Sequence, residues 1–359
     1  MGRPAQPSPT GGSSGAASRH PGPGRRWRAA GAVAGIVALL LVAAAIVLAS
    51  DASDGDGRGA TSPIADLDAE LAVARSVDDA VPAARTRAFD GDRALRLVRL
   101  QVAAGPRPAG SEALSRVRRR LVARLPRARA ERVAGHPGLV NVVGRIPGRR
   151  PAVVLAAHYD TQLDPPGFVG ANDSAAGTAV VLEVARALDR IDRAERRTAR
   201  RKGRAAPRRR EVRFVLLDGE ELPPAGDPAR FAEQGLRGSR AYAERHHRSL
   251  GSVVVADYVA GRGLRLPREP GSDPGLWRRV RAAADRAGVG AVFAGEGRTA
   301  IVDDHLPFLW RGVPAVTLID WDHPVKNTAA DRIDRLSLRA IDATGEALVE
   351  WVRRERRRR

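Results

Sequence analysis

A short segment of the chain joins an apolar strand to closely spaced acidic residues. The run FVLLDGEEL, residues 214–222, passes from apolar side chains to Asp218, Glu220 and Glu221 within a few positions. Burying an unpaired carboxylate costs free energy, and proteins offset that cost with a counter-charge, a proton or a metal ion. The segment therefore predicts a site where one of these three is present.

Ionisable residues also follow the other apolar runs expected to be strands. His158 and Asp160 follow VVLAA, Asp257 follows SVVVA, and Asp173 lies in the turn VGANDSAAG before an expected helix. Each has an ordinary structural interpretation, because a lone aspartate is commonly a cap or turn former and a lone histidine is commonly buried and hydrogen-bonded. Grouped at neighbouring strand ends, however, so many carboxylates would oppose one another's ionisation. A divalent cation removes that conflict, and nitrogen and oxygen ligands without sulfur suit catalytic zinc.

The adjacent residues Glu220 and Glu221 predict a division of roles. Side chains of neighbours on an extended segment point to opposite sides. One glutamate is therefore expected to bind the metal while the other faces the substrate as a general acid or base. The chain has no cysteine, which excludes disulfides and thiolate ligands.

The apolar pattern predicts the elements that hold these residues. Val- and Leu-rich runs indicate strands at 139–146, 152–160, 212–221, 252–259 and 314–320. Helical periodicity indicates helices near 66–100, after the N-cap candidate Ser111, at 175–191, 238–246 and 276–288, and from Ser337 onward. Strands alternating with helices are typical of an α/β fold, here a three-layer sandwich with a mostly parallel central sheet. Sites in such folds gather at the carboxyl ends of the strands.

The N-terminal region predicts a membrane anchor. Residues 1–28 are basic and rich in Pro, Gly and Ser, which indicates a disordered cytoplasmic tail, and residues 29–50 form an uncharged stretch long enough to span a bilayer once as a helix. The preceding arginines predict that the rest lies outside the cytoplasm. A signal peptide cleaved before Ser50 is the alternative, although the long basic leader favours an uncleaved anchor. Residues 51–65 are then a flexible linker to a catalytic domain over 66–355.

The formal net charge of +20 is concentrated in three segments. Residues 1–28, 193–210 and 353–359 carry nearly all of the excess, and the remainder of the chain is close to neutral. Such runs are usually solvated tails or loops, with contact to an anionic membrane or cell-wall surface as the alternative. The segment 193–210 falls between a helix and a strand and is interpreted as a surface insertion. A nucleic-acid partner is not expected.

Six motifs resemble, in order and spacing, the M28 family of zinc exopeptidases. They are AAHYDT, FVGANDSAAG, LLDGEEL, GLRGSRAYA, VVADYVAG and DDHLPFLWRGVPAV. The last three are especially similar to animal-type glutaminyl-peptide cyclotransferases, also called glutaminyl cyclases. The resemblance covers roughly residues 95–352.

The resemblance implies roles for individual residues. Asp173 and Glu221 match metal ligands in both branches, and Glu220 matches the general acid/base. His158 and Asp257 match ligands of a second metal in the two-zinc aminopeptidases, whereas in the cyclases, which resemble one-zinc enzymes, Asp257 joins Asp303 in a hydrogen-bond network around the catalytic glutamate. Residues expected to support the site without binding metal are Asp160, which orients His158, together with Asp304 and His305.

The chain departs from the family near its C-terminal end. Where the family has a Trp-His or similar pair whose histidine binds zinc, the segment DHPVKNTAADRIDRLS places Lys326 and Asn327. A neutral amide oxygen is a poor substitute for imidazole on zinc. His323 is a candidate replacement ligand. The resemblance also implies an aromatic wall in the cyclase pocket, and in this chain Lys326 removes it.

These observations predict a zinc-dependent enzyme that acts on peptide or protein N-termini with one or two zinc ions. Conversion of an N-terminal glutamine to pyroglutamate, with release of ammonia, is placed first. Aminopeptidase activity is the alternative, because the His158, Asp173 and Asp257 set is intact. A further alternative is an inactive M28-like binding protein, because Asn327 replaces a ligand.

Overall fold

The structure, a computed structural model, describes residues 63–358. The strands are β1 (Arg129–Arg132), β2 (Val140–Ile146), β3 (Arg149–His158), β4 (Arg210–Leu217), β5 (Leu250–Ala256) and β6 (Ala315–Leu318). The helices are α2 (Pro63–Arg75), α3 (Gly91–Val102), α4 (Glu112–Val122), α5 (Gly177–Arg201), α6 (Phe231–Gln234), α7 (Arg237–His246), α8 (Pro274–Ala287), α9 (Leu306–Trp310) and α10 (Leu338–Glu355). A π-helical turn, η2 (Ala171–Ala176), precedes α5, and three 3₁₀ turns are η3 (Pro228–Arg230), η4 (His247–Ser249) and η5 (Ile333–Arg335).

The strands form one mixed sheet in the order β1-β2-β4-β3-β5-β6. The four strands β4, β3, β5 and β6 are parallel, and Leu155 in β3 pairs with Phe214 in β4 and Val254 in β5. The expected parallel pairing of 152–157 with 212–217 is confirmed. The sheet is less uniformly parallel than expected, because β1 and β2 are joined to it in antiparallel register.

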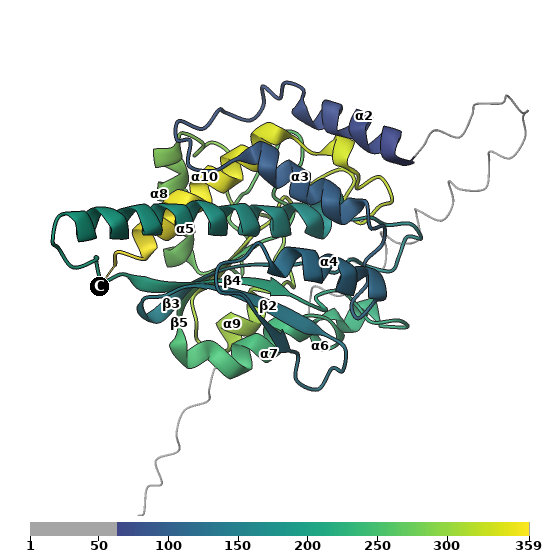
Figure 1. The fold of residues 1–359 in the computed structure, drawn as a ribbon. Helices are drawn as coiled ribbons and strands as arrows, with labels where there is room; N and C mark the ends of the chain where they lie inside the picture. The colour runs from purple at the N-terminus through teal and green to yellow at the C-terminus, as the bar shows by residue number, and fades with distance from the viewer. Residues whose placement is uncertain (1–62, 359) are drawn as a thin grey trace, which may run out of the picture. The chain divides into compact units, whose positions relative to one another are not determined.

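Helices cover both faces of the sheet and give three layers (Figure 1). Alternate residues of the parallel strands enter two separate cores, as the period of two in a strand requires. Leu155 and Phe214 pack into the core that contains α3, α5, α8 and α10. Ala156 and Val215 pack into the smaller core beneath α7 and α9. This burial on both faces explains why the strands read as continuous Val- and Leu-rich runs.

Two predicted helices have different boundaries in the structure. The helix expected near 66–100 is two helices, α2 and α3, separated by a segment that contains Pro82. A proline removes a helical hydrogen-bond donor and disfavours helix before it, so a single helix across this segment is disfavoured. The start after Ser111 is confirmed, because its side chain accepts a hydrogen bond from the Leu114 amide at 3.1 Å.

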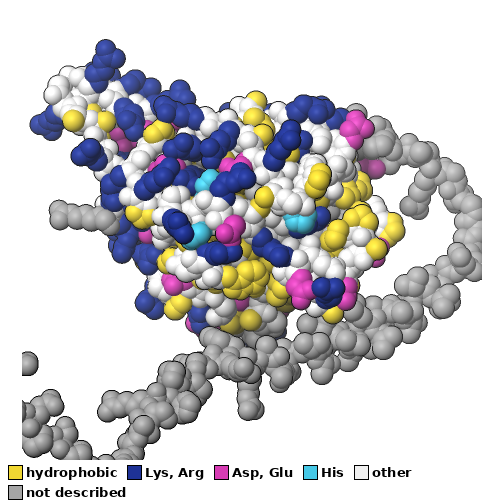
Figure 2. Space-filling view, turned by 90° about the horizontal axis from the view of Figure 1, so that it is seen from below, with side chains coloured by type: hydrophobic (Ala, Val, Ile, Leu, Met, Phe, Trp, Pro, Cys, Tyr) yellow, Lys and Arg dark blue, Asp and Glu magenta, His cyan; other side chains and the backbone are white. Residues whose placement is uncertain are grey.

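The Arg-rich segment 193–210 is shorter as a loop than expected. Its first half continues α5 to Arg201, and β4 begins at Arg210, so only 202–209 connect the two elements. In Figure 1 the last turns of α5 project past the sheet. Lys and Arg side chains are also spread over the face seen in Figure 2, with acidic side chains among them.

The predicted tail at 1–28 and membrane span at 29–50 lie outside the described residues. Most of the linker at 51–65 does as well, but its last three residues belong to α2, which begins at Pro63. Between residues 63 and 358, no helix has the length and apolar character needed to cross a membrane.

Candidate metal and catalytic site

The carboxyl ends of three neighbouring strands supply the centre of the site. His158 is the last residue of β3, Asp257 follows β5, and Glu220 and Glu221 follow β4. Parallel strands place these ends at one edge of the sheet. Asp173 reaches the same place from η2, just before α5. All five side chains are buried.

His158 lies at the centre of this group. Its Nε2 is 3.0 Å from Asp173 Oδ1 and 3.4 Å from Asp257 Oδ1. Its Nδ1 faces Asp160 Oδ1 at 3.7 Å and Glu220 Oε2 at 3.9 Å. Burial lowers the pKa of His158, but its acidic neighbours outweigh burial and raise that pKa well above its ordinary value. The histidine is therefore surrounded by negative charge.

Glu220 and Glu221 face the same centre, so the prediction that they point to opposite sides is wrong. Each offers an oxygen that, together with a His158 nitrogen, forms a group whose atoms lie within 4.8 Å of one another. Alternation does not apply because β4 ends at Leu217 and the chain turns at Gly219, whose φ is +77°. The backbone amides of both glutamates donate to the Asp160 carboxylate, at 3.3 and 3.2 Å.

The first acidic residue of the segment, Asp218, has a structural role instead. Its Oδ2 accepts hydrogen bonds from the Val140 amide at 2.7 Å and the Tyr159 hydroxyl at 3.1 Å. It joins the end of β4 to the start of β2 and does not face His158.

The site fits a metal ion. Two groups of ligand atoms are brought together, one of His158, Asp173 and Asp257 and one of His158, Glu220 and Glu221. In the described part of the chain, His158 is the only basic side chain within 4.0 Å of these carboxylates. Burial and neighbouring acids raise the pKa values of Glu220 and Glu221 well above the ordinary glutamate value, and burial raises that of Asp257 to about 7. A divalent cation bound by nitrogen and oxygen donors would relieve this excess of negative charge.

Asp303 and Asp304 lie near Glu220 without belonging to either ligand group. Their negative charges add to the rise in the pKa of Glu220. Asp304 is fully buried, and neither of its carboxylate oxygens has a clear hydrogen-bond partner. Burial and the Asp303 charge raise the pKa of Asp304 well above its ordinary value.

His305 contacts a different acid from the ones that form the centre. Its Nε2 is 3.2 Å from Glu269 Oε2. Burial raises the pKa of Glu269, but His305 and the amides of Gly271 and Ile301 lower it to about 2. Glu269 is thereby fixed as a carboxylate beside the site.

The segment that departs from the family pattern lies against the same centre. Asn327 Oδ1 is 2.9 Å from the hydroxyl of Tyr258, which in turn is 2.7 Å from Asp173 Oδ2. The His323 ring packs closely against Gly261, and this histidine belongs to neither ligand group found in residues 63–358. Lys326 Nζ lies 3.1 Å above the centre of the Trp321 ring.

A family model described as peptidase family M28 matches residues 141–352, which include the whole ligand set. The chain belongs to peptidase family M28. This finding confirms the family resemblance of the six motifs.

This M28 chain is similar to proteins of both branches considered above. It is 32% identical over 210 residues to a glutaminyl-peptide cyclotransferase-like protein of Bos taurus, covering 51% of this chain and 52% of that one. It is 25% identical over 218 residues to aminopeptidase YwaD of Bacillus subtilis (strain 168), covering 57% and 42%. These alignments span about half the length of the curated relatives.

Solved structures give broader coverage. The glutaminyl cyclase of an Acidobacteriales bacterium matches with a TM-score of 0.64 and 27% identity, covering 77% of this M28 chain and 99% of that one. A glutaminyl cyclase from Fimbriiglobus ruber matches with a TM-score of 0.59 and 25% identity, covering 76% and 97%. The mixed α/β fold is therefore that of a known group of solved enzymes.

Four residues that support the M28 site were not predicted from the sequence. Asp331 accepts hydrogen bonds from the amides of Asn172 and Asp173, at 2.8 and 3.0 Å, and its burial raises its pKa to about 8. Arg107 is fully buried and donates to the Val169 carbonyl at 2.8 Å. The other two are Tyr258 and Glu269. Asp331 and Tyr258 lie within the quoted segments DHPVKNTAADRIDRLS and VVADYVAG, but nothing in their spacing reveals the contacts.

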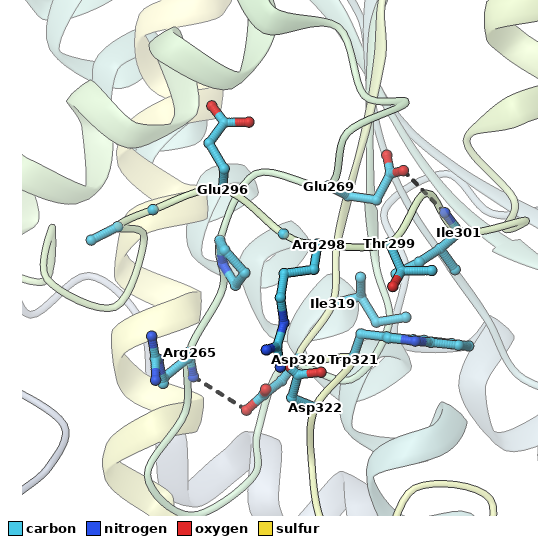
Figure 3. A pocket seen from close by; sticks show the side chains of 14 residues that line it. Arg265, Glu269, Glu296, Arg298, Thr299, Ile301, Ile319, Asp320, Trp321 and Asp322 are labelled. Atoms are coloured by element: carbon cyan, nitrogen blue, oxygen red, sulfur yellow. Dashed lines mark hydrogen bonds and ion pairs between the residues drawn. The ribbon is translucent and has the colours of Figure 1, made fainter. Parts of the chain in front are cut away.

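A cavity of 360 Å³ lies next to residues that contact the site. It is lined by Glu269, which contacts His305, and by Trp321, which contacts Lys326. Figure 3 shows the Asp320 carboxylate in this cavity, where it accepts a hydrogen bond from the Arg265 amide at 3.2 Å. Its charged lining side chains, which include Arg265, Arg298 and Glu269, suit a polar group.

Proposed function

We propose that this chain is a zinc-dependent enzyme acting on peptide N-termini and that its reaction is the cyclisation of an N-terminal glutamine. The buried group of His158, Asp173, Glu220, Glu221 and Asp257 carries the proposal, because within residues 63–358 its acidic members have no basic partner except the histidine. Relatives named as glutaminyl-peptide cyclotransferase and glutaminyl cyclase favour this reaction.

The proposed roles follow from the positions of the side chains. Zinc, when bound, would polarise the γ-carboxamide carbonyl of the glutamine. The substrate α-amine attacks the carbon of that carbonyl, the bond from this carbon to the amide nitrogen breaks, and a five-membered lactam and ammonia form. Glu220 takes the proton from the attacking amine and gives it to the departing nitrogen.

The surroundings of Glu220 suit this exchange of a proton. Burial, Glu221, Asp303 and Asp304 raise its pKa well above the ordinary glutamate value, although His158 opposes the rise. A raised pKa makes this carboxyl group a stronger base, which suits the step in which it takes a proton from the amine. Asp160 fixes the backbone at Glu220, which limits movement of its side chain.

Aminopeptidase activity is the second candidate, and the intact group of His158, Asp173 and Asp257 favours it. In that reaction Glu220 would take a proton from the water that attacks the first peptide bond. The similarity to aminopeptidase YwaD supports the same alternative.

A direct test combines metal content with turnover on the same sample of the full chain. Elemental analysis is expected to find zinc, and a Gln-initiated peptide is expected to release ammonia while an aminoacyl-anilide is not cleaved. Cleavage of the anilide alone would favour the aminopeptidase. A folded, metal-free and inactive protein would contradict both enzyme proposals and favour a binding protein.

The location of the enzyme is a separate proposal that depends on residues 29–50. We propose that they anchor the domain on the outer side of a membrane. Protease treatment of intact cells is expected to digest the domain, and recovery of the full chain in the soluble fraction would contradict the anchor.

A further inference from the structure

Tyr258 occupies the space between a predicted metal ligand and the position where the family ligand is missing. Its hydroxyl donates to Asp173 Oδ2 at 2.7 Å and lies 2.9 Å from Asn327 Oδ1. The backbone N–H of Asn327 also donates to this hydroxyl, at 3.3 Å. The tyrosine is 2% exposed, so these contacts are shielded from water.

The single proton of the phenol makes its two contacts unequal. A hydrogen bond to an ionised carboxylate is shorter and stronger than one to a neutral amide, so the phenol O–H donates to Asp173 and not to Asn327. Rotation of the Asn327 side-chain amide exchanges its oxygen and nitrogen. In the rotated form, the side-chain NH₂ group donates to the phenol oxygen. Both neighbours are then satisfied without a metal ion between them.

The two oxygens of Asp173 therefore differ in availability. Oδ2 accepts the phenol proton, whereas Oδ1 faces His158 Nε2 at 3.0 Å. Asp257 Oδ1 lies on this same side, 3.4 Å from Nε2. Oδ1 therefore faces His158 and Asp257 without the phenol in the way, whereas a cation at Oδ2 on the Asn327 side would have to share that space with the Tyr258 hydroxyl.

The surroundings of Tyr258 and Asn327 hold this arrangement in place. The tyrosine ring packs with Ile301, Ile319 and Trp321. Asn327 has a φ of 57°, a left-handed conformation that asparagine adopts more readily than most residues, histidine being another of the tolerated types. A ligand at position 327 would have to displace a packed phenol.

We infer that Tyr258 closes the metal position beside Asn327, so that the chain binds one divalent metal ion, held by His158, Asp173 and Asp257. The inference rests on the proposed function only in taking zinc as the ion. It assigns Glu221 no necessary part in holding that ion. Tyr258 is a positioning residue, because it acts through Asp173.

Zinc titration of the metal-free full chain by calorimetry tests which acids hold the ion. One ion per chain is expected. Asp257→Asn is expected to weaken zinc binding at least about tenfold, whereas Glu221→Gln, a change of the same kind in an equally buried acid, is expected to change it less than about threefold. Two ions in the wild type, or a larger loss with Glu221→Gln than with Asp257→Asn, would overturn the inference.

A second set of variants tests whether Tyr258 is the obstacle. The double variant Tyr258→Phe with Asn327→His is expected to bind two ions, whereas Asn327→His alone binds one. Tyr242→Phe with Asn327→His is the matched control, because Tyr242 is also buried but contacts Arg213. Two ions in Asn327→His alone or in the control, or one ion in a folded double variant, would contradict the role given to Tyr258. Stoichiometry is measured without substrate, so failure of the proposed reaction would leave this result readable.

Discussion

The two ends of β4 bury charge in opposite ways. At its start, Glu211 lies 2.6 Å from Arg213 Nε and 2.9 Å from Arg145 Nη2. Beyond its end, Glu220 and Glu221 have no arginine within ion-pair distance in the described chain, and their basic neighbour is His158. All three side chains are shielded from water, Glu211 being 2% exposed and the two later glutamates 8% each, so each charge depends on partners within the protein.

The pKa values of these glutamates express the difference. Burial raises the pKa of Glu211, but its bonds with Arg213 and Arg145 lower it below the ordinary value. Burial and other acids raise the pKa of Glu220. A buried acid with arginine partners stabilises its ionised form within the protein, whereas a buried group of acids without them favours uptake of a proton or a metal ion. The comparison therefore separates structural charge from charge available for chemistry.

The largest expected effect is on turnover. Glu220→Gln keeps the shape of the side chain but removes its ability to exchange a proton, so the rate on a Gln-initiated peptide is expected to fall about 10²–10⁴-fold. Glu211→Gln is the matched control and is expected to keep turnover within about threefold at 25 °C, because general-acid or base chemistry does not involve it. Equal losses of turnover in Glu220→Gln and Glu211→Gln would contradict a special chemical role for Glu220.

Removal of an arginine-paired acid is expected to have the largest effect on stability. Glu211→Ala leaves Arg213 buried without its partner and is expected to lower the free energy of unfolding by about 3 kcal/mol, measured in urea at neutral pH. Because the folded-state pKa of Glu211 is lowered, its contribution is present above the ordinary glutamate range and is lost as the pH falls below it. If the difference in unfolding free energy between Glu211→Ala and wild type grew as the pH fell, this account would be wrong.

Removal of metal is expected to affect only the other end of the strand. With free zinc at about 100 times its dissociation constant, binding adds about 2.7 kcal/mol to the free energy of unfolding, and a chelator removes that gain. Glu211→Ala is expected to lose a similar amount on chelation, whereas Asp257→Asn loses much less. Melting curves with and without chelator measure these losses of stability. A wild-type melting temperature that the chelator does not change would show that the acids do not need the ion for stability.

The smallest expected effect has the opposite sign. Asp304→Asn imitates a protonated, neutral Asp304 and is expected to raise the stability of the metal-free protein by about 1 kcal/mol at neutral pH. The folded protein holds a proton on Asp304 more tightly than the unfolded chain does, so stability falls as the pH rises above the ordinary aspartate range. The gain should therefore disappear in acid, and destabilisation at neutral pH would show that Asp304 is paired.

The sequence predicted the layers of the fold and the residues that meet at the carboxyl ends of the strands, because both depend on local pattern. Continuous apolar runs such as 152–157 identify buried strands, and polar residues at their ends identify the functional edge. The orientations of Glu220 and Glu221 were wrong because the chain turns at Gly219 before it reaches them. The apolar pattern alone also missed the division of the helix expected near 66–100, although Pro82 within it disfavours a continuous helix.

Contacts between distant residues could not be predicted in the same way. Tyr258 and Asn327 are 69 positions apart, and Asp331 is 158 positions from the amide of Asp173 that it accepts from. No spacing rule connects such residues, since their proximity depends on how β5 and the loops after β6 pack. The replacement of a ligand by Asn327 was visible in the sequence, but the phenol beside it required the structure.

The bond from Asp173 to Asp331 has a consequence for how the enzyme is made. During synthesis, the first ligands emerge long before the residue that holds the backbone at Asp173. A nascent chain that has passed His158 and Asp257 but has not reached residue 331 lacks this support, so its proposed metal ligands are not expected to be held as they are in the finished domain. The centre should therefore be completed late in synthesis, after the segment that contains Asp331 has emerged.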